Sequence, residues 1–223
     1  MIDGQTHHFL YRGLYDGVSF LMDRETGSYW NHITGRAMHG PLEGAKLPVA
    51  NLLHMSVEQA RAAYPDLRVA ISDRPIRGEQ SPFWPVAKQV PVLPDRFLST
   101  MAGEDTRRPT MDVGLGVWSD GAARFYPLEH VAESNDMAFD KLDGRGLLVY
   151  FDPAGHALAA IYTEARDASW DGKTLGLSDG TSIRQGVLYG PDGERRPMDR
   201  PLQLFTRWYG FALTFPETEV YEP

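Results

Sequence analysis

The chain contains no cysteine among its 223 residues. This absence excludes disulfides, thiolate zinc sites, iron–sulfur clusters and cysteine nucleophiles. The sequence also lacks any apolar run close to the roughly 18 residues that a membrane-spanning helix needs, so we expect no membrane insertion. The N-terminus has neither the basic segment nor the apolar segment of a signal peptide. Together these absences favour a soluble, cytoplasmic protein, with a periplasmic protein whose leader has been removed as the alternative.

Basic residues are fewer than acidic ones. Lys and Arg number 22 against 30 Asp and Glu, which gives a formal net charge of −8 at pH 7. A nucleic-acid-binding protein needs a basic face, and the basic residues here are scattered along the chain. The sequence therefore predicts no nucleic-acid partner.

Glycine and proline are plentiful, with 22 and 16 residues. They favour many turns and short strands over long helices. We therefore predict a mainly β (α+β) fold with a few short helices. One helix should begin at the capping box of residues 56–59 and stop at Pro65. Residues 204–213 place apolar and aromatic residues at helical spacing, which predicts a core helix.

The two ends of the chain resemble each other. Three pairs of segments match in residue type and order: residues 3–6 and 171–174, 38–41 and 188–191, and 64–69 and 215–220. We predict two related β-rich halves, residues 1–75 and 112–223, joined by a proline-rich connector over 76–111 and packed into one body. The second half lacks a hairpin that the first half contains. Special chemistry in that hairpin, or its simple loss from one copy, would explain the difference equally well.

Three strings carry a family resemblance: D-R-E-T-G-S-Y-W at 23–30, T-G-R-A-M-H-G-P-L-E-G at 34–44 and F-Y-P-L-E at 125–129. They resemble the bacterial family called domain of unknown function 3179, over residues 1–71 and more weakly over 112–221. The family has no established activity, so the resemblance implies no substrate. Its members often carry a Cys-Pro-Leu-Cys segment upstream of the part that matches I-D-G-Q-T-H-H-F. This chain resembles a short form without that segment, and no cysteine chemistry is carried over.

The predicted hairpin of the first half contains two histidines that could lie close together. If residues 34–35 form a two-residue loop, Trp30 pairs with His39 and His32 pairs with Ala37. Cross-strand partners and alternate residues share a face of the sheet, so all four side chains would lie on one face. His32 and His39 would then be diagonal neighbours, with backbones roughly 7–8 Å apart.

Two imidazoles at this separation can converge on one ion. We predict a divalent metal site formed by His32 and His39, with His54 as a third ligand if the following helix folds back over the hairpin. No compact motif such as H-E-x-x-H supports this prediction. The alternative is that these histidines pack or form hydrogen bonds without a metal, since a Trp beside a His is a good cross-strand pair.

The residues just before this hairpin form a second candidate site. Polar groups in a loop between two strands can face a bound ligand. We predict a small-ligand site from six residues: Asp23, Arg24, Glu25, Tyr29, Trp30 and Asn31. The structural alternative is that Asp23 opens a turn by accepting bonds from nearby backbone N–H groups, and that Gly27 closes it with a positive φ.

Three functions follow from these observations. The one we favour is binding of a small ligand or a metal ion at the first-half hairpins. The second is a metal- or histidine-dependent enzyme of unknown substrate at the same place. The third is a scaffold or interaction module without small-molecule chemistry. The sequence indicates no cofactor other than a divalent metal, and it does not determine an oligomeric state.

Overall fold

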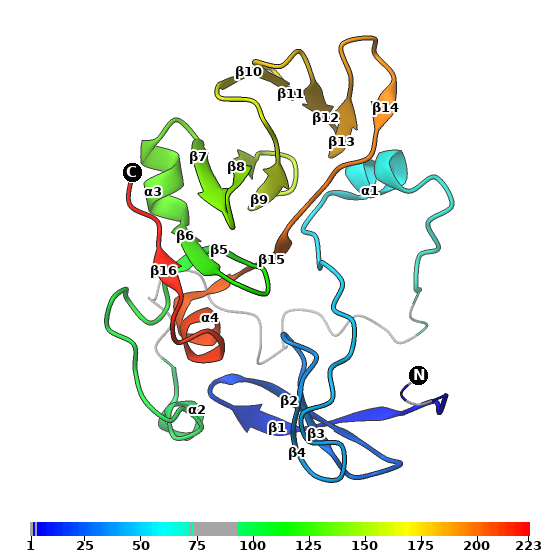
Figure 1. The fold of residues 1–223 in the computed structure, drawn as a ribbon, viewed down its shortest axis with the longest axis vertical. Coiled ribbons are helices and arrows are strands. Elements are labelled where there is room, and N and C mark those ends of the chain that lie inside the picture. Colours follow the sequence, from blue (N-terminus) through cyan, green and yellow to red (C-terminus); the bar gives the residue numbers. More distant parts are fainter. Residues whose placement is uncertain (1, 3, 72, 74–92) are drawn as a thin grey trace.

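The computed structural model describes residues 2, 4–71, 73 and 93–223 (Figure 1). This part of the chain contains four sheets and four short helices, so the predicted mainly β fold class is confirmed. Among the described residues no helix is long and apolar enough to cross a membrane. Residues 76–92 of the predicted connector lie outside the described residues.

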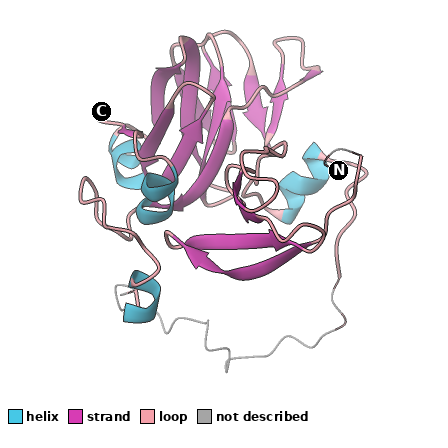
Figure 2. Ribbon diagram, turned by 60° about the horizontal axis from the view of Figure 1, so that its bottom comes forward, coloured by secondary structure: helices cyan, strands magenta, loops and turns pink. Residues whose placement is uncertain are grey.

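The N-terminal sheet has four antiparallel strands in chain order: β1 (Phe9–Tyr15), β2 (Val18–Asp23), β3 (Tyr29–Asn31) and β4 (Ala37–His39). Asp16 and Gly17 join β1 to β2 with φ values of 49° and 70°, which is the left-handed pair that a tight hairpin turn requires. A bulge between Tyr11 and Gly13 then shifts the register by one residue. Figure 2 shows this sheet as a separate layer beside the other strands.

Three further sheets follow. The first has the order β15 (Leu202–Arg207), β5 (Val113–Trp118), β6 (Ala123–Pro127) and β16 (Glu219–Val220), and the second is β7 (Met137–Leu142), β8 (Arg145–Asp152) and β9 (Ala157–Tyr162). The third is an antiparallel meander of β10 (Ala168–Asp171), β11 (Thr174–Leu177), β12 (Ser182–Arg184), β13 (Val187–Tyr189) and β14 (Arg195–Arg196). Figure 1 shows the meander at one end of the long axis and the N-terminal sheet at the other.

The helices are α1 (Val57–Ala63), α2 (Asp95–Leu98), α3 (Leu128–Glu133) and α4 (Trp208–Thr214). The predicted capping box of α1 is confirmed: Gln59 N donates to Ser56 Oγ at 3.2 Å, and Ser56 N donates to Gln59 Oε1 at 2.8 Å. The helix predicted over 204–213 is wrong in its first part. Residues 202–207 pair with β5 as β15, and the helix begins only at Trp208.

Aromatic residues of α4 make one of the cores. Trp208 and Phe211 are fully buried, and the Phe125 ring lies 5.1 Å and 5.8 Å from theirs between centroids. Gly116 in β5 makes room for this contact, because a Cβ atom there would lie 2.1 Å from the Phe211 ring. This packing fixes α4 on the sheet formed by β15, β5, β6 and β16.

Two turns related by the predicted internal repeat have the same backbone. Tyr64 ends α1 with φ −131° and ψ 83°, and Phe215 ends α4 with φ −127° and ψ 77°. Each carbonyl accepts a bond from the N–H three residues later, at 3.0 Å from Leu67 and 2.9 Å from Thr218. The similarity is local, and the division into two related halves stays a prediction.

Candidate functional site

Asp23 is the centre of the loop between β2 and β3. It is fully buried at the end of β2. Thr26 donates to its Oδ1 from the backbone N at 2.6 Å and from Oγ1 at 2.8 Å, and Trp30 Nε1 donates to its Oδ2 at 2.8 Å. Gly27, with φ 72°, closes the turn by donating to the Asp23 carbonyl at 3.0 Å. The turn role proposed for Asp23 and Gly27 is therefore present.

The carboxyl group of Asp23 is held in its ionised form. Burial raises its pKa, but the hydrogen bonds from Trp30 and Thr26, together with the neighbouring His7 side chain, outweigh burial and lower the pKa from 3.8 to about 2. Hydrogen bonds to a carboxylate favour the charged form, because each donor stabilises negative charge. A buried negative charge is thus present at neutral pH.

This charge gives the protein a defined acid sensitivity. Because the pKa of folded Asp23 lies below its ordinary value, its contribution to stability is present above pH 4 and lost as the pH falls from about 4 to about 2. We expect the melting temperature of the parent to fall more steeply across this interval than that of Asp23→Asn. Thermal unfolding followed by circular dichroism measures both. Identical pH profiles would contradict the assignment.

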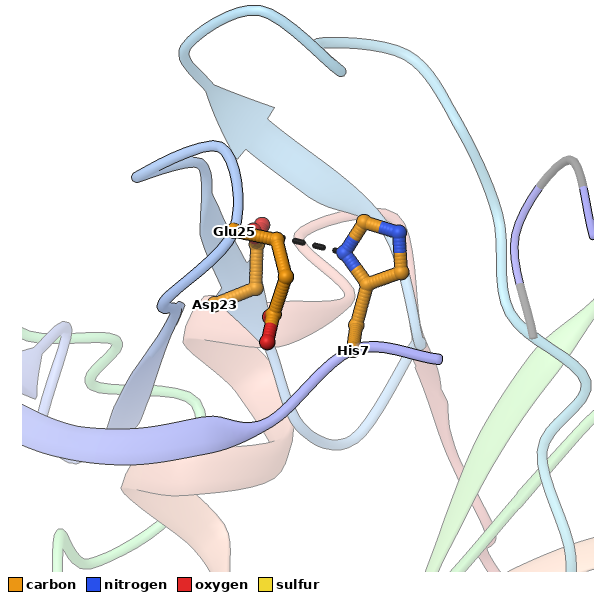
Figure 3. Close-up of side chains that lie close together, drawn as sticks. All are labelled: His7, Asp23 and Glu25. Carbon is orange, nitrogen blue, oxygen red and sulfur yellow. Dashed lines mark ion pairs between the residues drawn. The ribbon is translucent and has the colours of Figure 1, made fainter. Parts of the chain in front are cut away.

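His7 faces the Asp23 carboxylate from the segment before β1 (Figure 3). Its side chain is 4% exposed, and its Nδ1 lies 3.3 Å from Asp23 Oδ1. The two groups form a close ion-pair contact, and among the described residues Nδ1 is a buried nitrogen without a hydrogen-bond partner. Buried polar atoms are nearly always paired, so this one calls for an explanation.

Glu25 is the third member of this group. His8 donates to Glu25 Oε2 from its backbone N at 2.8 Å, and the His8 Nδ1 lies 2.7 Å from Oε1. The His8 side chain and then the His8 backbone lower the pKa of Glu25. One ligand atom each from His7, Asp23 and Glu25 lies within 4.8 Å of the other two. We call these three residues the His7 cluster.

The predicted register of the β3–β4 hairpin is wrong. Trp30 pairs with Ala37, and Tyr29 pairs with His39. The cause is Asn31, whose Oδ1 accepts from the backbone N of Ile33 at 2.9 Å and of Thr34 at 3.1 Å. Residues 32–35 therefore form a four-residue loop, closed by the bond from the Asn31 N to the Arg36 carbonyl at 3.0 Å.

The three histidines predicted as metal ligands have separate surroundings. His32 lies in the loop, with Nδ1 2.7 Å from the Ser19 carbonyl oxygen. His39 is exposed beside the Tyr29 ring, and His54 lies edge-on to the Phe205 ring at 5.5 Å. Among the described residues, none of the three belongs to a group of three potential ligands. The new register explains this for His32 and His39, since they no longer share a face as diagonal neighbours.

The six residues predicted to bind a ligand divide into three groups. Asp23 and Glu25 belong to the His7 cluster. Trp30 is buried and supports the cluster through its indole N–H, whereas Arg24 is exposed. Tyr29 stacks on Phe20 with centroids 5.4 Å apart, and Asn31 organises the loop described above.

His7 was not among the residues predicted from the sequence. The register of β1 and β2 places Phe9 opposite Asp23, and the Arg24 N donates to the His8 carbonyl at 3.0 Å. Extended by two residues, this register sets His7 opposite Glu25 and on the face of Asp23. The turn dipeptide at 16–17 is the signal in the sequence that brings the two strands together.

Comparisons with known proteins identify the family of the chain. A family model described as "Protein of unknown function (DUF3179)" matches residues 1–218, so the chain belongs to this family. The resemblance stated from the sequence is thereby confirmed. No curated protein and no solved structure matches the chain.

Proposed function

We propose that this member of the DUF3179 family binds a divalent metal ion through His7 Nδ1 and the carboxylates of Asp23 and Glu25. The observation that carries the proposal is the buried Nδ1 of His7, which accepts or donates no hydrogen bond within the described part of the chain and lies 3.3 Å from a carboxylate oxygen. A metal ion would satisfy this nitrogen and would neutralise the buried negative charge of Asp23 beside it.

The separation of the two atoms supports this proposal. With metal–ligand bonds of about 2.0–2.2 Å, two ligands of a tetrahedral ion lie roughly 3.3–3.6 Å apart. His7 Nδ1 and Asp23 Oδ1 are at 3.3 Å, so they match without moving. The Glu25 side chain is 18% exposed, and one of its carboxylate oxygens lies within 4.8 Å of the other two ligand atoms.

The chemistry of the donors indicates which ions fit. One imidazole nitrogen with two carboxylates suits zinc, manganese or iron(II), whereas calcium and magnesium prefer oxygen ligands alone. Bonds from Trp30 and Thr26 orient the Asp23 carboxylate, and His8 orients that of Glu25. Such supporting bonds commonly hold metal ligands in place.

Titration of untagged, chelator-treated protein with zinc and manganese chloride tests the proposal by calorimetry. We expect one ion per chain for the parent and binding weaker by roughly tenfold or more for His7→Ala and Glu25→Gln. The ion should also raise the melting temperature of the parent, since it binds only the folded state. His39→Ala is the matched control, because it removes an exposed histidine of the same sheet.

The control should bind as the parent does, and circular dichroism should show that all variants are folded. Absence of uptake by the parent, or unchanged uptake by folded His7→Ala, would refute the proposed site.

A further inference from the structure

A cavity of about 820 Å³ lies between α1 with its flanking residues, β13, and residues 195–200, which comprise β14 and the start of the segment to β15. Figure 1 shows α1 next to β13 and β14, toward the end of the molecule that carries the meander. No residue of the His7 cluster lines this cavity. Its volume falls within the roughly 300–1,000 Å³ of small-molecule sites.

The wall of this cavity carries more positive than negative charge. Among the described residues, three arginines and one aspartate line it: Arg195, Arg196, Arg200 and Asp199. Asp199 forms an ion pair with Arg145, and Arg196 forms one with Asp192. Within the described part of the chain, no ion pair includes Arg195 or Arg200. Two positive charges thus remain here without a carboxylate, in a chain whose formal net charge is −8.

Arg200 is half-buried and held by neutral groups. Its Nη1 donates to the Ala160 carbonyl at 3.0 Å, and the Tyr150 hydroxyl lies beside the guanidinium. A guanidinium has five N–H donors, so at least three remain for a ligand. In the described part of the chain, the enclosed side-chain nitrogens and oxygens without a partner belong to His7, Tyr150 and Gln185. No unbonded nitrogen of Arg200 is therefore closed off from solvent.

Arg195 is oriented in the same manner. Its Nη1 donates to the Ala62 carbonyl at 3.3 Å, and its Nη2 donates to the Ala63 carbonyl. These carbonyls belong to the last turn of α1, whose carbonyl oxygens have no partner within the helix. A carbonyl oxygen fixes the position of a guanidinium without cancelling its charge. Arg195 is exposed, so its remaining N–H groups are accessible to a ligand.

The other lining residues provide apolar surface. Apart from Asn51 they are apolar side chains and one glycine. Met55 and Tyr64 come from the two ends of α1, and Val187 and Met198 come from β13 and from the segment after β14. Tyr64 is 50% exposed although it is a large aromatic residue. A ligand that covers this surface removes it from water, which favours binding.

We infer that this cavity binds an organic oxyanion: a carboxylate or phosphate group that Arg195 and Arg200 hold, on an apolar body that lies against Tyr64 and Met55. Guanidinium groups present their N–H donors in a planar fork that matches the oxygens of both anions. The carbonyl partners fix the two arginines before a ligand arrives, which reduces the side-chain entropy lost on binding. A neutral or cationic ligand would leave both positive charges uncompensated.

The test is calorimetric titration of untagged, chelator-treated protein with phenyl phosphate and with benzoate at low ionic strength. The two probes carry the same ring and differ in the anion, so the tighter one identifies the preferred group. We expect saturable binding of one molecule per chain for at least one of them. Benzyl alcohol and benzylamine, which carry a neutral and a positively charged group, should not bind. Arg195→Gln and Arg200→Gln should each weaken binding by about tenfold or more, the contribution of a hydrogen bond between charged groups.

Both variants should fold, as circular dichroism would show. The Ala160 carbonyl also accepts from Gln203 Nε2 at 2.9 Å, so it keeps a donor in Arg200→Gln. Arg195 is exposed, so water can replace its bonds to the end of α1. Arg184→Gln is the matched control, because it removes an arginine of the same meander that lies over the Tyr189 ring and does not line the cavity. It should bind as the parent does.

Three results would overturn the inference. Neither anion could bind the parent, or the anions could bind either folded cavity variant as tightly as they bind the Arg184→Gln control. Benzyl alcohol or benzylamine could also bind as tightly as the anions, which would assign a ligand without negative charge. Because the protein is metal-free and the His7 cluster does not line the cavity, none of these results depends on the proposed metal site.

Discussion

Asp23→Ala is expected to lower the free energy of unfolding by about 3–5 kcal/mol. The change leaves the buried Trp30 indole N–H and the partly buried Thr26 backbone N–H without an acceptor. Each unsatisfied buried donor costs about 1–3 kcal/mol. The Thr26 hydroxyl also loses both of its carboxylate contacts, at 2.8 and 2.9 Å. Urea unfolding in the presence of chelator measures the effect without any contribution from a metal.

The matched control for this prediction is Asp120→Ala. Asp120 also forms a contact at 3.2 Å, with Lys46, but its side chain is 99% exposed. Exposed ion pairs contribute little, so its loss should change the free energy by less than about 1 kcal/mol. Equal effects of the two substitutions would show that Asp23 does not hold the β2–β3 loop together.

Phe211→Ala is expected to cost about 3–5 kcal/mol, because it empties the centre of the aromatic core of α4. The ring is fully buried, with centroids 4.8 Å from Phe215 and 6.1 Å from Trp118. Gly116 has no side chain that could fill the space. The neighbouring backbone belongs to a paired strand, so the site cannot collapse easily and a cavity should remain.

Equilibrium unfolding measures this cost, and Leu52→Ala is the control. Leu52 is also a large apolar residue, but it is 69% exposed and its loss should change stability by about 0.5 kcal/mol or less. Burying two CH₂ groups contributes about 1.5 kcal/mol to the free energy of unfolding. A loss smaller than this in Phe211→Ala would mean that α4 does not depend on this contact.

Features that depend on neighbouring residues could be predicted from the sequence. The capping box of α1 and the turn at Asp23 and Gly27 both formed as described from the sequence. In each case a few adjacent residues provide both the donor and the acceptor, or the required φ. The mainly β fold class follows from many such turns.

Where local patterns competed with pairing between distant strands, sequence reasoning failed. Residues 204–207 match a helical pattern, but they lie next to β5 and form a strand. The β3–β4 register was also wrong, because the Asn31 side chain bonds two backbone N–H groups and widens the loop. The residue types at 34–35 favour a tight turn, but they do not show that the Asn31 side chain forms these bonds.

The sequence by itself determined the family and the fold class. It also led to the prediction that Asp23 and Glu25 contact a small ligand, and the structure places both in the His7 cluster. Only the tertiary structure brought in His7, because the bulge between Tyr11 and Gly13 decides which residue of β1 faces which residue of β2. A shift of one residue in a strand moves a side chain to the opposite face. The contact between α1 and the β12–β13 turn also depends on tertiary structure, since Gln185 donates to Glu58, 127 residues away in the chain.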